Sequence, residues 1–279
     1  LARASLRFLS DAQGIEGGFR NRLDRRGYWE DRPLVDDCWG RSLWALGTVA
    51  AYAEEDWMRQ SAVTLFERSA RRRSPWSRAM SYAALGAAEL LAIAPWHREA
   101  RALAGAVADA MPMGTAPGWA WPEARLSYAN AVLPEAMIAT GHATGRADVL
   151  DRGLELLAWL LDHESNDGHV SVTPAGGDAP GSRRPAFDQQ PIEVAAIAEA
   201  CARAATVDPS NRRWPAGVDA AAAWFLGEND VGCVMFDPAT GGGYDGLEVT
   251  GPNLNQGAES TLAMLSTLQH HRRIVPAPA

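Results

Sequence analysis

Two kinds of helix alternate along this sequence of 279 residues. One kind is amphipathic: residues 55–72 and 147–163 carry acids and arginines beside a stripe of leucine and tryptophan side chains. The other kind is small and apolar on nearly every side, as in residues 77–93 and 191–206. Because a helix without a polar face has to be packed on every side, we expect the second kind to form an inner ring that the first kind surrounds.

The apolar periodicity predicts ten helices in all. They cover residues 2–13, 37–53, 55–72, 77–93, 97–110, 128–143, 147–163, 191–206, 214–227 and 257–270. The sequence therefore predicts an all-α fold, an (α/α) toroid or barrel of about five to six helical hairpins, in a single domain over residues 1–279. Since Leu1 already lies inside a predicted helix, we expect that the chain is truncated at its N-terminus.

The links from outer to inner helices are long. Four of them begin with a glycine followed by an aromatic residue or a histidine: Gly18-Phe19, Gly118-Trp119, Gly168-His169 and Gly243-Tyr244. Long ordered loops in a compact domain are usually functional. We therefore expect these long loops to line one rim of the toroid and to carry the site, with residues 182–187 as a mobile lid.

Composition excludes several classes of function. All 26 basic residues are arginines, so Schiff-base chemistry and a phosphate-binding loop with its lysine are excluded. The net charge of −8 and the scattered arginines argue against nucleic-acid binding. The histidines and the three cysteines have no metal-ligand spacing, so we expect no metal and no cofactor. With no signal segment and no apolar run of membrane-spanning length, we expect a cytoplasmic protein without a membrane span.

Two segments far apart in the chain repeat one another. Gln190-Pro-Ile-Glu193 recurs as Gln256-Gly-Ala-Glu259, with both glutamines and both glutamates offset by 66 positions. Each segment opens an apolar helix, and one interpretation is a capping box, in which the glutamate reaches back to the helix N-terminus. The surplus of polar residues beside them favours a second interpretation, a site that hydrogen-bonds a ligand rich in hydroxyls. Those neighbouring residues are Asp188, Gln189, Asn253 and Asn255.

A pair of acids heads the helix predicted at residues 37–53. Asp36 and Asp37 can cap the helix, and Asp37 can form an ion pair with Arg41 four residues later. Two adjacent acids exceed what capping needs, and tryptophans follow at 39 and 44. The segment therefore also fits a functional site, with Asp37 and Arg41 on the helix face directed to the ring centre.

Alternating tryptophans beside a carboxylate occur in Trp119-Ala-Trp121-Pro-Glu123. Aromatic faces can stack on the C–H surface of a sugar ring while an acid bonds its hydroxyls or protonates a glycosidic oxygen. The alternative is a core hairpin with a capping glutamate. Tyr128 and Asn130 follow on the same loop, and Tyr244 with Asp245 stands in a glycine-rich segment where Asp245 can instead serve as a turn former.

Four segments together carry a resemblance to a known family: DDCWGRSLWALG, WAWPEARLSYANAVLPEA, FDQQPIEVAAIAEAC and GGGYDGL with NLNQGAESTLAML. Over nearly the whole chain they resemble the helical toroid domain found within or beside bacterial glycosyltransferases and other enzymes of glycan-processing loci. The family pattern has W-x-W-F-E and Y-D-N where this chain has Pro122 and Ala129, so Glu123 and Asn130 match and an acid at position 129 is missing. The resemblance implies a carbohydrate ligand and a glycosyltransferase as a possible partner.

A looser similarity links the Asp36-Asp37 pair to endo-acting α-mannanases with the same kind of barrel, and implies that one acid is the nucleophile and the other the acid/base. N-acylglucosamine epimerases also resemble this architecture. They work with histidines near the ring centre, and here only His169 lies on the expected rim.

We therefore expect a glycoside hydrolase that cleaves a bacterial oligo- or polysaccharide with a pair of carboxylates. The alternatives are a non-catalytic glycan-binding or scaffolding domain and a sugar epimerase. The candidate catalytic residues are Asp37, Glu123, Asp188 and Glu259. The candidate substrate-binding residues are Asp36, Trp39, Arg41, Trp119, Trp121, Tyr128, Asn130, Gln189, Gln190, Glu193, Tyr244, Asp245, Asn255 and Gln256.

Overall fold

The computed structural model describes residues 1–110 and 118–274. Within them lie all ten predicted helices: α1 (Ala2–Ala12), α2 (Asp37–Tyr52), α3 (Asp56–Ser69), α4 (Ser77–Ile93), α5 (Arg98–Ala110), α6 (Val132–Thr144), α7 (Ala147–His163), α8 (Pro191–Val207), α9 (Arg213–Phe225) and α10 (Ala258–Ile274). The start of α6 and the end of α10 differ most from the predicted bounds. Local periodicity was therefore sufficient to predict the helices.

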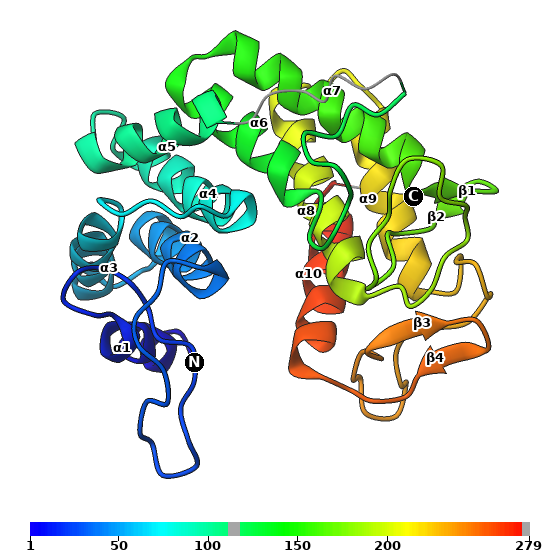
Figure 1. Cartoon of the computed structure of the whole chain (residues 1–279), viewed down its shortest axis with the longest axis horizontal. Helices are drawn as coiled ribbons and strands as arrows, with labels where there is room; N and C mark the ends of the chain where they lie inside the picture. The colour runs from blue at the N-terminus through cyan, green and yellow to red at the C-terminus, as the bar shows by residue number, and fades with distance from the viewer. Residues whose placement is uncertain (111–117, 275–279) are drawn as a thin grey trace. The chain divides into compact units, whose positions relative to one another are not determined.

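In the described part of the chain, two small antiparallel hairpins lie in loops between helices (Figure 1). In the α7–α8 loop, β1 (Ser165–Asn166) pairs with β2 (His169–Val170), with Ser165 opposite Val170. In the α9–α10 loop, β3 (Gly246–Glu248) pairs with β4 (Gly251–Asn253), with Gly246 opposite Asn253. Both hairpins lie in the long outer-to-inner loops that the sequence singled out.

The chain divides into two compact units. One consists of Leu1–Met111 with Ala136–Asp151, and the other of Pro112–Glu135 with Arg152–Ala279. The first unit contains α1 to α5, and the second contains α8 to α10 with both hairpins, while the boundary falls within α6 and α7.

In the first unit, α2 and α4 pack backbone against backbone. A side chain added at Gly47 would overlap the carbonyl oxygen of Gly86, and one added at Gly86 would overlap that of Leu43. Nearer the start of α2, a side chain added at Gly40 would likewise overlap the carbonyl oxygen of Ala79. The short distance between the backbones of α2 and α4 therefore requires small residues where the two helices meet. Helix α4 is buried on all its faces, as predicted.

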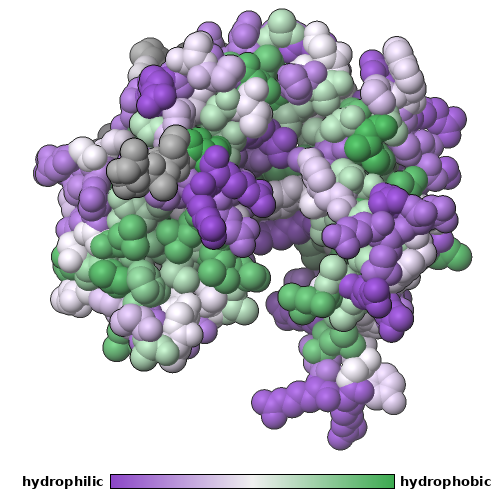
Figure 2. Space-filling view, turned by 180° about the vertical axis from the view of Figure 1, so that it is seen from behind, coloured by the Kyte–Doolittle hydropathy of each residue, from purple (hydrophilic) through white to green (hydrophobic). Residues whose placement is uncertain are grey.

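The outer elements of this unit are tied on by side chains. Gln13, just after α1, donates through Nε2 to the carbonyl of Leu65 and to the hydroxyl of Ser69, each at 2.7 Å, which joins α1 to α3. The loop from α1 to α2 then extends away from the helices, and within it Leu23 forms an isolated antiparallel β-bridge with Trp29. Its tip projects at the lower right of Figure 2 and is covered with hydrophilic side chains.

In the second unit, α8 is the buried inner helix, and α9 and α10 pack against it. Gly217 of α9 faces the Cys201 thiol of α8, so that close approach again depends on a glycine. The hydroxyl of Ser266 on α10 donates to Glu199 of α8 at 2.8 Å. Among the helices of the described residues, none is long and apolar enough to cross a membrane.

The α2–α4 contact makes a sharp prediction about stability. Gly47→Ala should lower the free energy of unfolding by about 2 kcal/mol or more, because the new methyl group has to push two backbones apart. Gly105→Ala in α5 is the matched control, since nothing lies within 4 Å of the added carbon. This control should raise stability by about 1 kcal/mol through helix propensity. Urea unfolding of both variants measures the difference, and equal midpoints would refute the proposed packing.

Candidate functional site

A pocket of about 270 Å³ opens in the second unit, where the N-termini of α8 and α10 come together. One wall comes from the start of α8 and the other from the α9–α10 loop and the first turn of α10. The repeated segments of the sequence therefore do meet at one place. The lining residues are Gln190, Pro191, Ile192, Asp245, Gly257, Ala258, Glu259 and Ser260.

Asp188 is not a lining residue of this pocket, but its side chain hydrogen-bonds with that of Gln190, which is one. Its Oδ1 is buried and has no hydrogen-bond partner, and it lies so close to Gly246 that a side chain there would overlap it. Burial raises the pKa of Asp188 above the ordinary value for aspartate, and the negative charges of Glu248 and Asp245 raise it further. A hydrogen bond with the side chain of Gln190 acts in the opposite direction without cancelling the shift. Asp188 is therefore suited to hold a proton.

Asp245 is used differently, as the cap of α10. Its Oδ1 accepts hydrogen bonds from the backbone N–H of Gly257 and the hydroxyl of Ser260, each at 2.7 Å, and Asn255 donates to Oδ2. The bond from Ser260, with those from Asn255 and Gly257, lowers the pKa of Asp245 despite some burial. Asp245 is thus an ionised wall of the pocket, as well as the residue that fixes the start of α10.

Gln189 lies in the core, contrary to its predicted contact with a sugar. Its side chain has no exposed surface. Its Nε2 donates to Asp230 at 2.6 Å and to the carbonyl of Ala186 at 3.0 Å, while its Oε1 accepts from Trp224. Its backbone pairs in both directions with Leu247 of β3. Gln189, which follows Asp188 in the chain, is therefore fixed in position, and its hydrogen bonds join the α7–α8 loop to the α9–α10 loop.

Asp230 receives several donors at once. Its Oδ1 accepts from Asn166 at 2.8 Å and lies 2.9 Å from Nε2 of His169, while its Oδ2 accepts from Gln189. Burial alone would raise the pKa of Asp230, but hydrogen bonds from Ser171, Gln189, Asn166 and His169 outweigh it and lower the pKa. The side chain is 1% exposed, so this carboxylate is a structural anion at the base of the loop.

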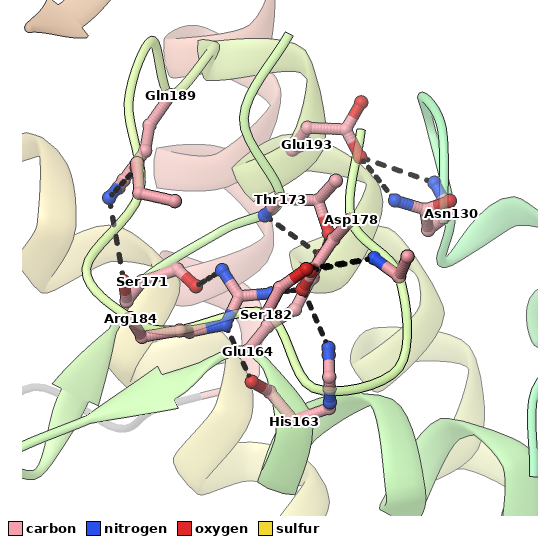
Figure 3. A network of polar contacts seen from close by, with 12 residues as sticks. Asn130, His163, Glu164, Ser171, Thr173, Asp178, Ser182, Arg184, Gln189 and Glu193 are labelled. Atoms are coloured by element: carbon pink, nitrogen blue, oxygen red, sulfur yellow. Dashed lines mark hydrogen bonds and ion pairs between the residues drawn. The ribbon is translucent and has the colours of Figure 1, made fainter. Parts of the chain in front are cut away.

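The segment predicted to be a mobile lid is anchored instead. Arg184 donates to the carbonyls of His163 and Ser171 at 2.8 and 2.6 Å and to Oδ2 of Asp178 at 2.9 Å (Figure 3). The same Asp178 oxygen lies 2.8 Å from Nε2 of His163. Burial alone would raise the pKa of Asp178, but Ser182, His163 and the charge of Arg184 lower it. The glycine- and proline-rich composition suggested mobility, whereas a nine-tenths buried arginine fixes the segment.

Glu193 reaches from the first turn of α8 to the turn that precedes α6. Its carboxylate accepts hydrogen bonds from the backbone N–H groups of Ala129 and Asn130 and from the Asn130 side chain (Figure 3). Ala129 has a φ of 44°, the left-handed region that non-glycine residues rarely adopt. Glu193 and Asn130 are both buried, and the side-chain Oδ1 of Asn130 accepts from the backbone N–H of Ser127 at 3.0 Å, while the sugar contact predicted for these two residues stays a prediction. They hold the turn that precedes α6.

Three tryptophans among the candidate substrate-binding residues, of which Trp119 and Trp121 were predicted to stack on sugars, are buried. Trp39 is fully buried and donates to the carbonyl of Ser69, and Trp121 is 1% exposed. Trp119 is 6% exposed and meets Trp159 edge to face at 5.2 Å. Their indole N–H groups find partners within the fold, with Glu123 accepting from both Trp119 and Trp121. The burial of Trp119 and Trp121 is consistent with the large apolar area of an indole, and their contact with a sugar stays a prediction.

The acidic pair at the head of α2 belongs to the first unit. Asp36 is the N-cap residue but makes no capping hydrogen bond, and its Oδ1 accepts from the Cys38 thiol at 3.1 Å. Asp37 is the first residue of α2, and the guanidinium of Arg41 lies 4.8 Å from the Tyr82 ring. Glu123 belongs to the second unit, so its predicted pairing with Asp37 stays a prediction.

The remaining candidates are exposed or half-buried. Asn255 and Gln256 are exposed, but their side chains already bond Asp245 and Thr240 respectively. Tyr244 is half-buried and Tyr128 is 45% exposed, so both keep a surface that a sugar could contact. Glu259 is exposed on the pocket wall, whereas its repeat partner Glu193 is buried. The two copies of the repeat thus have different roles.

The sequence suggested no metal site, yet the fold brings three potential ligands together in the first unit. Ligand atoms of Glu67, His97 and Glu99 lie within 4.8 Å of one another. Glu99 is paired with Arg98 at 2.7 Å, and Nδ1 of His97 accepts from the backbone N–H of Ala100. Nε2 of His97 therefore carries the proton of the neutral ring and donates to Glu67. The cluster joins α3 to α5 as a polar contact.

Sequence reasoning missed the residues that hold the site together. Asp230, Arg184 and Asp178 come from loops whose composition indicates only turns, and nothing local identifies their partners. Gly246 is the exception, because a glycine directly after Asp245 in a predicted loop could have suggested a close approach.

Comparison with known proteins supports the fold class. No protein-family model and no curated protein matches the chain. Among solved structures, a sugar epimerase from a ruminal bacterium matches with a TM-score of 0.70 and 13% identity, over 96% of this chain and 81% of the epimerase. An unsaturated glucuronyl hydrolase specific for heparin matches with a TM-score of 0.56 and 9% identity, over 81% of this chain and 66% of the hydrolase. The chain therefore has the all-α, (α/α) toroid fold predicted from its sequence.

The buried Asp230 carboxylate makes stability depend on pH. Its folded pKa is lowered, so its contribution is present above the unfolded pKa of about 3.9 and is lost as pH falls through the folded pKa. Asp230→Asn should cost about 2–4 kcal/mol at pH 7, since an amide presents N–H groups to donors. We expect this cost to shrink as the pH is lowered from 5 to 3 in urea titrations. The exposed control Asp151→Asn should change little at any pH, and a cost for Asp230→Asn that is independent of pH would contradict the assignment.

Proposed function

We propose that this chain is a carbohydrate-active enzyme that hydrolyses a glycosidic bond, with Asp188 as the proton donor. The observation that carries the proposal is the setting of Asp188: a partly buried carboxyl with an unpartnered oxygen, subject to the charges of two other acids and hydrogen-bonded to Gln190, which lines a small pocket. The solved structures of similar fold include a sugar epimerase and a glucuronyl hydrolase, which supports a sugar as the substrate.

Glycoside hydrolysis needs an acid that still carries its proton near neutral pH. An exposed aspartate is ionised there, whereas burial and the neighbouring charges of Asp245 and Glu248 favour the protonated form of Asp188. When Asp188 gives its proton to the leaving oxygen it becomes an anion, and the repulsion from Asp245 and Glu248 then favours its reprotonation from solvent. The chemistry therefore follows from the same charges that shift the pKa.

A second carboxylate has to activate water or attack the sugar. Glu259 lies on the wall of the same pocket and is exposed, which makes it our candidate within the second unit. Asp37 and Glu123 stay candidates from the sequence. The hydroxyls of the sugar would bond Gln190 and Ser260, which line the pocket, and Tyr244 would provide an aromatic surface.

Sugar epimerisation is a second candidate, favoured by one observation besides the similarity in fold. Two histidines of the second unit, His163 and His169, are each held through Nε2 by a buried aspartate and are each about one-fifth exposed. A carboxylate partner of this kind orients an imidazole for proton transfer. Product analysis separates the two reactions, because hydrolysis releases a new reducing end and epimerisation does not.

The test is product release from mannans, glucans and arabinans, analysed by chromatography for wild type and Asp188→Asn. We expect wild type to release sugar and the variant to lose at least about 100-fold in rate, the scale of a general acid. Asp151→Asn, an exposed substitution of the same type, should retain full activity. Glycan binding without release by wild type would favour a non-catalytic domain, and an epimerised product would favour the second candidate.

Asp188→Asn also has a readout that does not depend on activity. Because the folded pKa of Asp188 is raised, its ionised form destabilises the fold at pH values above that pKa. The neutral amide removes this cost, so the melting temperature of Asp188→Asn at pH 7 should equal or exceed that of wild type. A variant that melted much earlier would show that inactivity came from misfolding.

The pH dependence of hydrolysis should identify the donor. Activity falls as pH rises through the pKa of the acid, so we expect an alkaline limb set by Asp188. Glu248→Gln removes one of the negative charges that raise this pKa, and should move the limb to lower pH. The exposed control Glu228→Gln should leave the profile in place. A limb unchanged by Glu248→Gln would assign the proton donor to another residue.

A further inference from the structure

The pocket between the starts of α8 and α10 has a one-sided charge. Asp245 and Glu259 line it, Asp188 hydrogen-bonds with its lining residue Gln190, and Glu248 is close enough to act on Asp188. Both charged groups that act on Asp188 are negative. The pocket therefore has a negative potential that a ligand must tolerate.

Helix N-termini usually have the opposite preference. Each contributes roughly half a positive charge and favours anions. Here the N-terminus of α10 is already neutralised by the ionised Asp245, which accepts from Gly257 and Ser260. The remaining helix charge is small beside the full charges of Glu248 and Glu259. The site has the location of an anion site but the wrong charge for one.

The size of the pocket sets a second limit. A volume of about 270 Å³ lies at the lower end of ligand sites and suits a single sugar ring. A carboxylate or phosphate on that ring could not stay far from the acids, and like charges at this range weaken binding.

We propose that this pocket binds a sugar ring without a negative substituent, a neutral or amine-bearing sugar, and discriminates against uronates and phosphorylated sugars. This inference rests on the proposed function, since it takes the same pocket as the sugar site. It sets the chain apart from the glucuronyl hydrolase of similar fold, whose named substrate is an acidic sugar. Substrate choice is then determined by the negative charges of the other acids at the pocket, with Asp245 on its wall and Glu248 close enough to act on Asp188.

The experiment measures the binding of matched monosaccharide glycosides by calorimetry at low salt. The probes are the methyl glycosides of glucose, mannose, glucosamine and glucuronic acid. We expect at least one of the first three to bind the wild-type chain, and the glucuronide to bind at least 10-fold more weakly than the glucoside. Glu248→Gln should reduce the ratio of glucoside to glucuronide affinity, because it removes a negative charge. Added salt should reduce this ratio as well, because it screens the charges.

Glu228→Gln is the matched control, because it removes the same charge from an exposed glutamate that does not act on Asp188. Glu228→Gln should leave the ratio of glucoside to glucuronide affinity unchanged. This result would show that the ratio depends on the acids near the pocket and not on the net charge of the chain. Equal or tighter binding of the glucuronide would overturn the inference, as would a ratio that does not respond to Glu248→Gln. Failure of all four probes to bind would also overturn it. Binding without turnover would preserve the inference and refute hydrolysis, so the two failures are distinguishable.

Discussion

The close approach of helix backbones is the constraint on which the rest of this fold depends. Where Gly47 and Gly86 bring α2 and α4 together, no side chain fits between them. Helices packed in this way have no space for polar side chains along most of their length, and α8 repeats the pattern with alanines. The candidate pocket accordingly lies at the starts of α8 and α10 and in the loop that leads into α10.

Those loops are ordered by buried polar contacts. Gln189 joins the α7–α8 loop to β3 through its backbone and to Asp230 through its side chain, so two long loops share one anchor. Arg184 fixes the middle of the first loop in the same way (Figure 3). Such contacts fix a conformation because each buried group would lose its partner in any alternative. The unpartnered oxygen of Asp188 stands out against this background.

Sequence reasoning succeeded where the signal is local. The helix bounds followed from periodicity, and the repeated Gln-x-x-Glu segments predicted that the starts of α8 and α10 share a site. It failed where burial decides. Trp39 and Trp121 look the same in sequence whether they stack on a sugar or fill a core, and Glu193 pairs with a turn 63 residues away. Long-range partners of this kind leave no trace in a single sequence.

The double use of Asp245 links occupancy of the pocket to the local order of α10. The carboxylate that walls the pocket also holds the amide of Gly257 and the hydroxyl of Ser260. Fraying of that first turn would move the wall, and a ligand resting on the wall would oppose fraying. A bound ligand therefore raises the free energy needed to open the first turn of α10. Amide hydrogen exchange at the start of α10 consequently reports whether the pocket is filled.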